Sequence, residues 1–165
     1  KEASGTGCMK LMLNGALTLG TLDGANIEMQ AAAGADNMYI FGLNSKEVDD
    51  LWSRGYHAAE YVANNEYLAR IINQLSIGFA GDSYTNLSSY LLTGEHGVAD
   101  PYMCLADFES YRAAHERMIA DYQDKAKWNR MSLLNIAASG FFSADRSIEE
   151  YAQRIWGLRK LTDQD

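Results

Sequence analysis

The stretch ALTLGTLDGANIEMQAAAGADNMYIFG, residues 16–42, decides the fold class of this chain. Residues 16–23 and 38–42 are rich in residue types that favour strands. Residues 24–34 between them are helix-prone and end on Gly34. A helix between two strands is the usual connection of a parallel pair, because parallel strands need a long crossover. We therefore expect a small parallel α/β unit here.

The residues on either side of this unit predict helices. Residues 9–14 form a short apolar pattern that the pair Asn14-Gly15 ends. After residue 43 the character changes, and Asn44 and Glu47 have the spacing of a capping box at a helix start. Further helical patterns cover residues 64–75, 107–123, 128–140 and 147–156, whereas 82–103 is rich in turn residues with one short helix.

Three of these helical patterns carry apolar stripes, which predict the faces that pack. A second capping box, with Ser147 as the cap and Glu150 three residues later, predicts the start of the last helix. The stripes are Tyr67, Leu68, Ile71, Ile72 and Leu75 on the first, Phe108, Tyr111, His115, Met118 and Tyr122 on the second, and Ile148, Tyr151, Ala152, Ile155 and Trp156 on the last. We expect one domain over residues 1–165, with an α/β segment over 1–43 and a mainly helical remainder over 44–165.

Composition restricts the class of protein. With 47% hydrophobic residues and a single proline, the chain of 165 residues is long enough for an ordered, helix-rich core. Its formal charge of -8 argues against a nucleic acid as partner. No apolar run approaches the length of a membrane span, so no membrane partner is expected. Cys8 and Cys104 are isolated, which predicts neither disulfides nor a metal site and fits a reducing cytoplasm.

The opening turn carries the strongest candidate for chemistry, because Lys10 follows Gly5-Thr6-Gly7 by about one helical turn. If a helix begins near Gly7, its first amides lack intrahelical acceptors and its dipole favours an anion. The Thr6 hydroxyl adds a donor. Lys10 rises only about 4.5 Å above Gly7, and helical side chains lean toward the N-terminus. Pyridoxal phosphate combines a phosphate for the helix end with an aldehyde for the amine.

Simpler interpretations of the opening turn stay open from the residues alone. A lysine early in a helix is usually a solvated surface residue, and Gly-Thr-Gly is more often a turn than a phosphate site. Lys10 could also form only an ion pair in another kind of phosphate-binding α/β protein. The stretch is not a Walker loop, and a dinucleotide fingerprint would need glycine where Lys10 stands.

Four other titratable residues are weaker candidates. We expect His57 and His96 at the surface and His115 packed on its helix, so none of the three is assigned to catalysis. Asp23 follows a predicted strand end, where ligand sites of α/β proteins collect. Since it precedes glycine, we expect it first of all to make a turn.

Residues 2–29, EASGTGCMKLMLNGALTLGTLDGANIEM, resemble the cofactor attachment segment of the glycogen, starch and maltodextrin phosphorylases. Residues 35–42 (ADNMYIFG), 106–111 (ADFESY) and 128–156 (WNRMSLLNIAASGFFSADRSIEEYAQRIW) resemble later blocks of that family, in the same order. The resemblance covers nearly the whole chain and is weakest over residues 65–102. It implies the C-terminal portion of the Rossmann-like cofactor domain of a GT-B glycosyltransferase, with few parallel strands and many helices.

The resemblance also implies roles for individual residues. Lys10 would hold pyridoxal 5'-phosphate covalently, and Thr6 and Gly7 would hold the cofactor's phosphate. A further set would contact hydroxyls of the transferred glucosyl unit: Glu2, Ser4 and Gly5. The implied reaction is the reversible transfer of glucosyl units from an α-1,4-glucan to phosphate, which gives glucose 1-phosphate with retention. A proton would pass through the 5'-phosphate of the cofactor.

Two departures from the family pattern matter. Cys8 stands where the family usually has asparagine, so a polar contact near the cofactor is lost or a thiol gained. The basic residues that hold substrate phosphate in the family have no counterpart here. We therefore expect this chain to be the final part of a longer enzyme that forms a homodimer. Alone it would lack phosphorolytic activity and act at most as a folding or association unit.

Overall fold

The N-terminal part is a small α/β unit, as the sequence predicts. The computed structural model describes residues 4–94 and 97–159. The strands are parallel, with Leu19 opposite Tyr39 and Thr21 opposite Phe41. This unit consists of α1 (Gly5–Leu13), β1 (Leu19–Thr21), α2 (Ala25–Ala33), a 3-10 turn η1 (Ala35–Asn37) and β2 (Tyr39–Phe41). β1 is shorter than the strand-prone stretch from which it was predicted.

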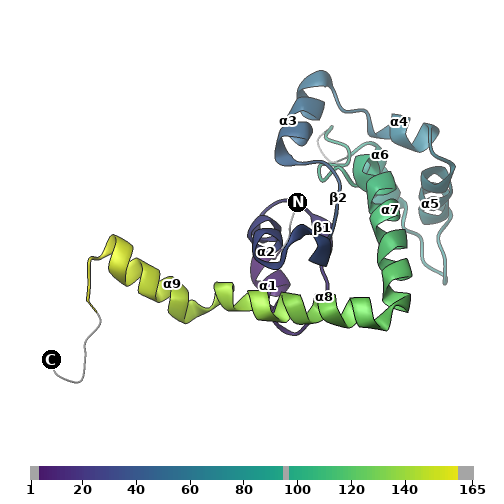
Figure 1. The fold of residues 1–165 in the computed structure, drawn as a ribbon. Helices are drawn as coiled ribbons and strands as arrows, with labels where there is room; N and C mark the ends of the chain where they lie inside the picture. The colour runs from purple at the N-terminus through teal and green to yellow at the C-terminus, as the bar shows by residue number, and fades with distance from the viewer. Residues whose placement is uncertain (1–3, 95–96, 160–165) are drawn as a thin grey trace.

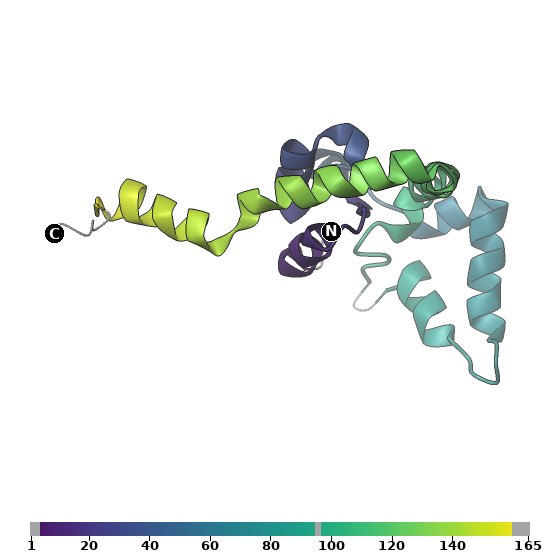
Figure 2. The ribbon, with the colours of Figure 1, turned by 60° about the horizontal axis from the view of Figure 1, so that its bottom comes forward.

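The remainder is helical, and two long helices organise it (Figure 1). α7 and α8 meet at a corner near Asp124, and α8 runs past α1 and α2 (Figures 1 and 2). The helices are α3 (Ser45–Arg54), α4 (Ala58–Ala63), α5 (Glu66–Ile77), α6 (Thr85–Leu92), α7 (Cys104–Gln123), α8 (Lys125–Ala138) and α9 (Ala144–Glu150), with a 3-10 turn η2 (Ser139–Phe142) and a π-helical turn η3 (Tyr151–Ile155). α4 is short and was not predicted. Over residues 4–94 and 97–159, no helix has the length and apolar character needed to cross a membrane.

Side-chain caps explain where two of the helices begin. At α3, the Asn44 side chain accepts the Glu47 N–H at 3.0 Å and the Glu47 carboxylate accepts the Asn44 N–H at 2.8 Å, which confirms the capping box. The predicted cap of the last helix is wrong. Ser143, not Ser147, caps α9 by accepting the Arg146 N–H, and the Ser147 hydroxyl donates to the Ser143 carbonyl. Helical backbone already surrounds Ser147, so its hydroxyl bonds to the preceding turn.

Two apolar cores hold the molecule together. One is a methionine cluster of Met12, Met29 and Met38 beneath α1 and α2, and Cys8 packs against it. The other is built from buried side chains of α4, α5 and α7, namely Ala58, Leu68, Ile72 and Leu105.

The structure corrects the predicted stripes in part. Tyr67 and Ile71 of α5 are 45% and 44% exposed, because the face of that helix that enters the core is the one with Leu68 and Ile72. On α7, His115 is half-buried, but Tyr122 is 50% exposed.

Buried polar contacts join the sheet to the α7–α8 corner. The Tyr39 hydroxyl of β2 donates to Asp121 Oδ2 at 3.0 Å, and Lys127 Nζ lies 2.6 Å from Asp121 Oδ1. The Tyr39 ring stacks on Trp128 at 6.3 Å. Further along α8, the buried Asn135 side chain donates to a backbone carbonyl of η1 at 2.8 Å. Strand β2 is therefore fixed to both long helices.

The Tyr39 hydroxyl should make stability depend on pH in the alkaline range. Burial, followed by the hydrogen bond to Asp121, raises the pKa of Tyr39 to about 12, from about 10 in an unfolded chain. The folded state thus holds this proton more tightly. Its contribution is complete below pH 10 and is lost as the pH rises to about 12. We predict that Tyr39→Phe lowers the free energy of unfolding by about 0.5–1.5 kcal/mol at pH 7 and makes the alkaline loss shallower.

Chemical denaturation between pH 7 and 12 measures this effect. Tyr102→Phe is the matched control, because the Tyr102 ring is 57% exposed. An equal alkaline loss in Tyr39→Phe and the unmodified chain would show that Tyr39 is not responsible.

The end of the described chain exposes apolar side chains. α9 and η3 extend away from the rest of the molecule (Figures 1 and 2). Ile148, Ile155, Trp156 and Leu158 are each more than half exposed. Among the described residues, the predicted apolar stripe of the last helix is therefore mostly exposed. An exposed apolar surface of this kind marks a contact region.

We predict that the chain self-associates through this end. Static light scattering should give an average mass above 18.3 kDa that rises with concentration. Ile155→Ser combined with Trp156→Ser should lower that mass, because the variant removes apolar area without touching either core. Gln153→Ser on the same turn is the control. A concentration-independent monomer would contradict the prediction.

Candidate functional site

The first turn of α1 is an open helix N-terminus. Ser4 caps it, since its hydroxyl accepts the Gly7 N–H at 3.2 Å. The first intrahelical bond runs from the Cys8 N–H to the Ser4 carbonyl at 3.0 Å. The amides of Gly5 and Thr6 precede that bond, so they have no acceptor within the helix. The helix starts at Gly5, two residues earlier than predicted, and so provides these two amides for an anion.

Gly7 is needed for the shape of this turn. A Cβ atom at Gly7 would lie 2.9 Å from Ser4 Oγ and 3.4 Å from Ser4 Cβ. Any larger residue would press on the hydroxyl that makes the cap. The turn therefore combines two glycines and two hydroxyl side chains for a steric reason as well as an electrostatic one.

Lys10 lies one turn further along α1 and is exposed. It follows Thr6 by four residues and Gly7 by three, so the three residues share one side of the helix. Its carbonyl accepts the Asn14 N–H at 3.2 Å and the Asn14 side-chain amide at 2.7 Å, which closes the helix on Asn14 as predicted. The amine is thus carried by a helix whose two ends are both capped.

The sequence-predicted site residues fall into two groups. The structure brings Ser4, Gly5, Thr6, Gly7 and Lys10 together in the first turns of α1. Glu2 lies outside the described residues, and so does His96 among the weaker candidates.

The two remaining histidines lie elsewhere in the fold. His115 stacks on Tyr111 with 5.7 Å between ring centroids, which fits its expected packing role, and His57 is exposed.

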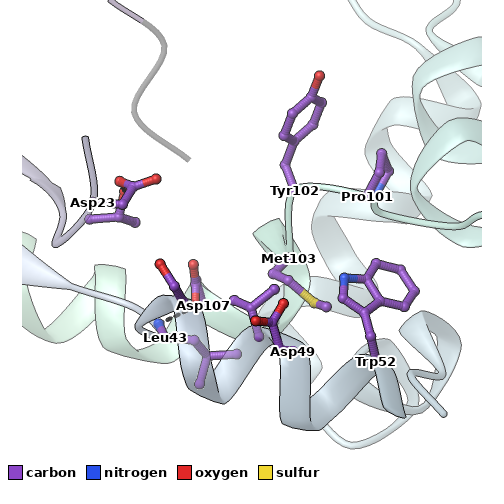
Figure 3. A pocket seen from close by; sticks show the side chains of 11 residues that line it. Asp23, Leu43, Asp49, Trp52, Pro101, Tyr102, Met103 and Asp107 are labelled. Atoms are coloured by element: carbon purple, nitrogen blue, oxygen red, sulfur yellow. Dashed lines mark hydrogen bonds between the residues drawn. The ribbon is translucent and has the colours of Figure 1, made fainter. Parts of the chain in front are cut away.

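A second polar region lies at the carboxyl ends of the parallel strands. There a cavity of about 260 Å³ opens between the end of β1, helix α3 and the start of α7 (Figure 3). Its polar and aromatic lining includes Asp23, Asp49, Trp52, Tyr102 and Asp107. Of these five residues, only Asp23 was a candidate from the sequence. The Thr21 hydroxyl donates to Asp23 Oδ1 at 2.7 Å, in accord with a turn role.

Asp107 is the buried member of this region, with 7% of its surface exposed. Its Oδ1 accepts the Leu43 N–H at 2.8 Å, which ties the residue after β2 to α7. Burial raises the pKa of the Asp107 carboxyl, and the Leu43 hydrogen bond opposes that rise. One sequence signal could have identified Asp107. It is a carboxylate in the first turn of a helix whose later residues form an apolar stripe.

A buried carboxylate shapes one wall of the cavity. Asp100 is fully buried and accepts the Tyr56 hydroxyl at 2.7 Å, the Cys104 N–H at 2.9 Å and the Leu105 N–H at 2.7 Å. These bonds fix the turn that leads through residue 102 to Met103, whose φ of 58° is left-handed. The hydrogen bonds of Asp100 therefore fix the shape of this cavity wall.

The comparison with known families agrees with this arrangement, which combines a glycine-rich helix start, a lysine one turn later and a small parallel sheet. A family model described as carbohydrate phosphorylase matches residues 1–158. The chain belongs to the carbohydrate phosphorylase family, which confirms the resemblance found in the sequence.

Individual relatives are glycogen phosphorylases. The chain is similar to that of Synechocystis sp., with 44% identity over 161 residues that cover 98% of this chain and 19% of the relative. The rabbit (Oryctolagus cuniculus) muscle form is 47% identical over 95% of this chain and 18% of the relative, and the Bacillus subtilis protein is 45% identical over 98% and 20%. The chain thus spans about a fifth of the length of these relatives.

The Ser4 cap makes a measurable contribution to α1. We predict that Ser4→Ala lowers the free energy of unfolding by about 1 kcal/mol, because the Gly7 N–H loses its acceptor. Amide exchange at Gly7 should become faster, which NMR measures directly. Ser89→Ala, in an exposed position within α6, should change neither quantity. Unchanged exchange at Gly7 in Ser4→Ala would show that the hydroxyl is not the cap.

Proposed function

We propose that this chain is the cofactor-carrying part of an α-1,4-glucan phosphorylase. The longer enzyme transfers glucosyl units from glycogen, starch or maltodextrin to inorganic phosphate and releases glucose 1-phosphate. The observation that carries the proposal is the first turn of α1, where amides without an acceptor inside the helix, the Thr6 hydroxyl and Lys10 lie close together. The family membership of the chain supports it independently.

The residues of this turn fit pyridoxal 5'-phosphate. The amides of Gly5 and Thr6 point out of the positive end of α1, and a phosphate is the ligand that such an end favours. The glycine at position 7 keeps the turn open, because a Cβ there would press on Ser4 Oγ. The Lys10 amine is the nucleophile that an aldehyde requires.

Each residue then has a defined task. Lys10 anchors and orients the cofactor, and its phosphate is held by Thr6 and by the turn at Gly7, whose own N–H donates to Ser4 Oγ. When bound, pyridoxal phosphate supplies a phosphate whose second pKa, near about 6, suits proton exchange with the substrate phosphate. Ser4 and Gly5, together with Glu2, contact hydroxyls of the glucosyl unit. Because Ser4 also caps α1, its hydroxyl couples the position of the sugar to that of the phosphate turn.

Cys8 alters the inner side of this helix rather than its open end. It is half-buried and packs against the methionine cluster of Met12, Met29 and Met38. A small side chain that can lie among apolar groups, such as a cysteine, suits that position. The replacement of the usual asparagine is therefore compatible with the proposed site on the opposite side.

The proposal extends to the architecture of the whole enzyme. Residues 1–43 form the α/β cofactor segment and 44–165 the helical remainder of a Rossmann-like domain of the GT-B type. The missing part supplies the groups that bind substrate phosphate and most of the glucan cleft, so the chain alone should release no glucose 1-phosphate. The complete enzyme is a cytoplasmic homodimer.

Covalent trapping tests the assignment of Lys10. We predict that borohydride reduction of the chain with pyridoxal 5'-phosphate modifies the Lys10 peptide, as mass spectrometry of a digest would show. Lys10→Ala should abolish that modification, whereas Lys46→Ala, which removes an exposed lysine of α3 paired with Asp50, should leave it unchanged. Thr6→Val should weaken retention of the cofactor without preventing attachment, because only a phosphate contact is lost. Modification spread evenly over all lysines would contradict the proposal.

A further inference from the structure

The C-terminal end of α1 contains Asn14-Gly15, the one asparagine-glycine pair in the sequence. Asparagine is most prone to lose its side-chain amide when glycine follows it, because a glycine has no side chain to hinder the attack of its nitrogen on that amide. Asn14 is exposed, so water can reach it. The pair also ends the helix that carries Lys10, four residues before Asn14.

The shape of this helix end requires glycine at position 15. The Gly15 N–H donates to the Met12 carbonyl at 3.0 Å, and the next N–H, that of Ala16, donates back to the Leu11 carbonyl at 3.0 Å. These two bonds form a Schellman motif, in which the glycine is left-handed, here with a φ of 81°. A Cβ atom at this position would lie 2.6 Å from Ser132 Oγ of α8. The helix end therefore retains the glycine that makes the asparagine labile.

The same helix end keeps the folded pair from reacting. Deamidation requires the Gly15 nitrogen to attack Asn14 Cγ, but its N–H is bonded to the Met12 carbonyl. The Asn14 ψ of 10° nearly eclipses the Gly15 nitrogen with the Asn14 nitrogen, which directs it away from the side chain. The leaving nitrogen is held too, because Asn14 Nδ2 donates to the Lys10 carbonyl at 2.7 Å. Opening of the last turn of α1 releases all three restraints together.

We propose that Asn14 is a deamidation site whose rate is set by opening of the last turn of α1. In the open turn the Gly15 nitrogen bonds to Asn14 Cγ, and the bond from Cγ to Nδ2 breaks. The departing amide group takes up the proton of the Gly15 nitrogen and leaves as ammonia. Water then opens the five-membered imide at one of its two carbonyl carbons, which gives aspartate or isoaspartate. Water is the only co-reactant, and no group is oxidised or reduced.

The product weakens α1. A carboxylate at position 14 cannot donate to the Lys10 carbonyl, and it adds negative charge at the helix end where the dipole disfavours it. In isoaspartate the backbone runs through the former side chain, which changes the spacing that the Schellman motif needs. Deamidation thus loosens the helix that carries the candidate site, whatever ligand that site takes.

Mass spectrometry of a digest measures the reaction, because replacing an amide by a carboxyl group raises the mass of the peptide by about 1 Da. The chain is incubated at neutral pH, folded in buffer or unfolded in guanidinium chloride. We expect position 14 to react at least about tenfold more slowly in the folded chain. Asn14→Gln is the control and should not react over the same period, because its ring closure would need a six-membered ring. Equal rates in the two states, or no reaction in the unfolded chain, would overturn the proposal.

Two further variants separate opening of α1 from unfolding of the whole chain. Ser132→Ala removes the hydroxyl that donates to the Gly15 carbonyl at 2.7 Å, and it should accelerate the reaction of the folded chain at least about threefold. Ile72→Val lowers the stability of the other core, away from α1, and should leave the rate unchanged. Equal acceleration by both variants would show that global unfolding sets the rate and would contradict the assignment to α1.

A variant that copies one product tests the consequence for α1. Asn14→Asp should lower the melting temperature by about 2–4 °C, because it removes the bond to the Lys10 carbonyl and adds the unfavourable charge. Asn86→Asp makes the same chemical change in the first turn of α6, where the helix dipole favours a carboxylate, and should not lower the melting temperature. An unchanged melting temperature in Asn14→Asp would refute the proposed weakening of α1.

Discussion

The rest of the structure depends on how two three-residue strands are kept in place. A parallel pair this small cannot be stable alone, so helices must hold it. The buried Tyr39 hydroxyl bound to Asp121 and the Asn135 amide bound to η1 do this from α7 and α8. Because β1 and β2 are fixed, their carboxyl ends form an edge at which the cavity can open.

Two polar regions lie next to this sheet and its helices. The α1 turn presents amides, hydroxyl groups and an amine, and it suits an anion and an aldehyde. The cavity at the strand ends is lined by three carboxyl groups and an indole. In both, hydrogen bonds within the chain set the shape, namely the exposed Ser4 cap in the first and the Asp100 network in the second.

The last described segment of the chain exposes apolar side chains. α9 and η3 expose Ile155 and Trp156, although the stripe that contains them has the spacing of a packed helix face. Since the chain spans about a fifth of its relatives, a side chain can be selected for packing and still lack its partner here. The spacing of a stripe therefore does not by itself show which of its residues are covered.

The sequence by itself determined the family, the parallel α/β unit, most helices and the residues of the α1 turn. It could do so because glycines, caps and apolar periodicity act over a few residues, as the Asn44–Glu47 capping box shows. Only the tertiary structure decided which apolar residues are covered, for example Leu68 but not Tyr67. Only it brought Asp107, Asp49 and Asp23 to one cavity, since 84 residues separate the first of them from the last and no local pattern records that meeting. Contacts between distant segments depend on how helices pack, and this packing formed the cavity.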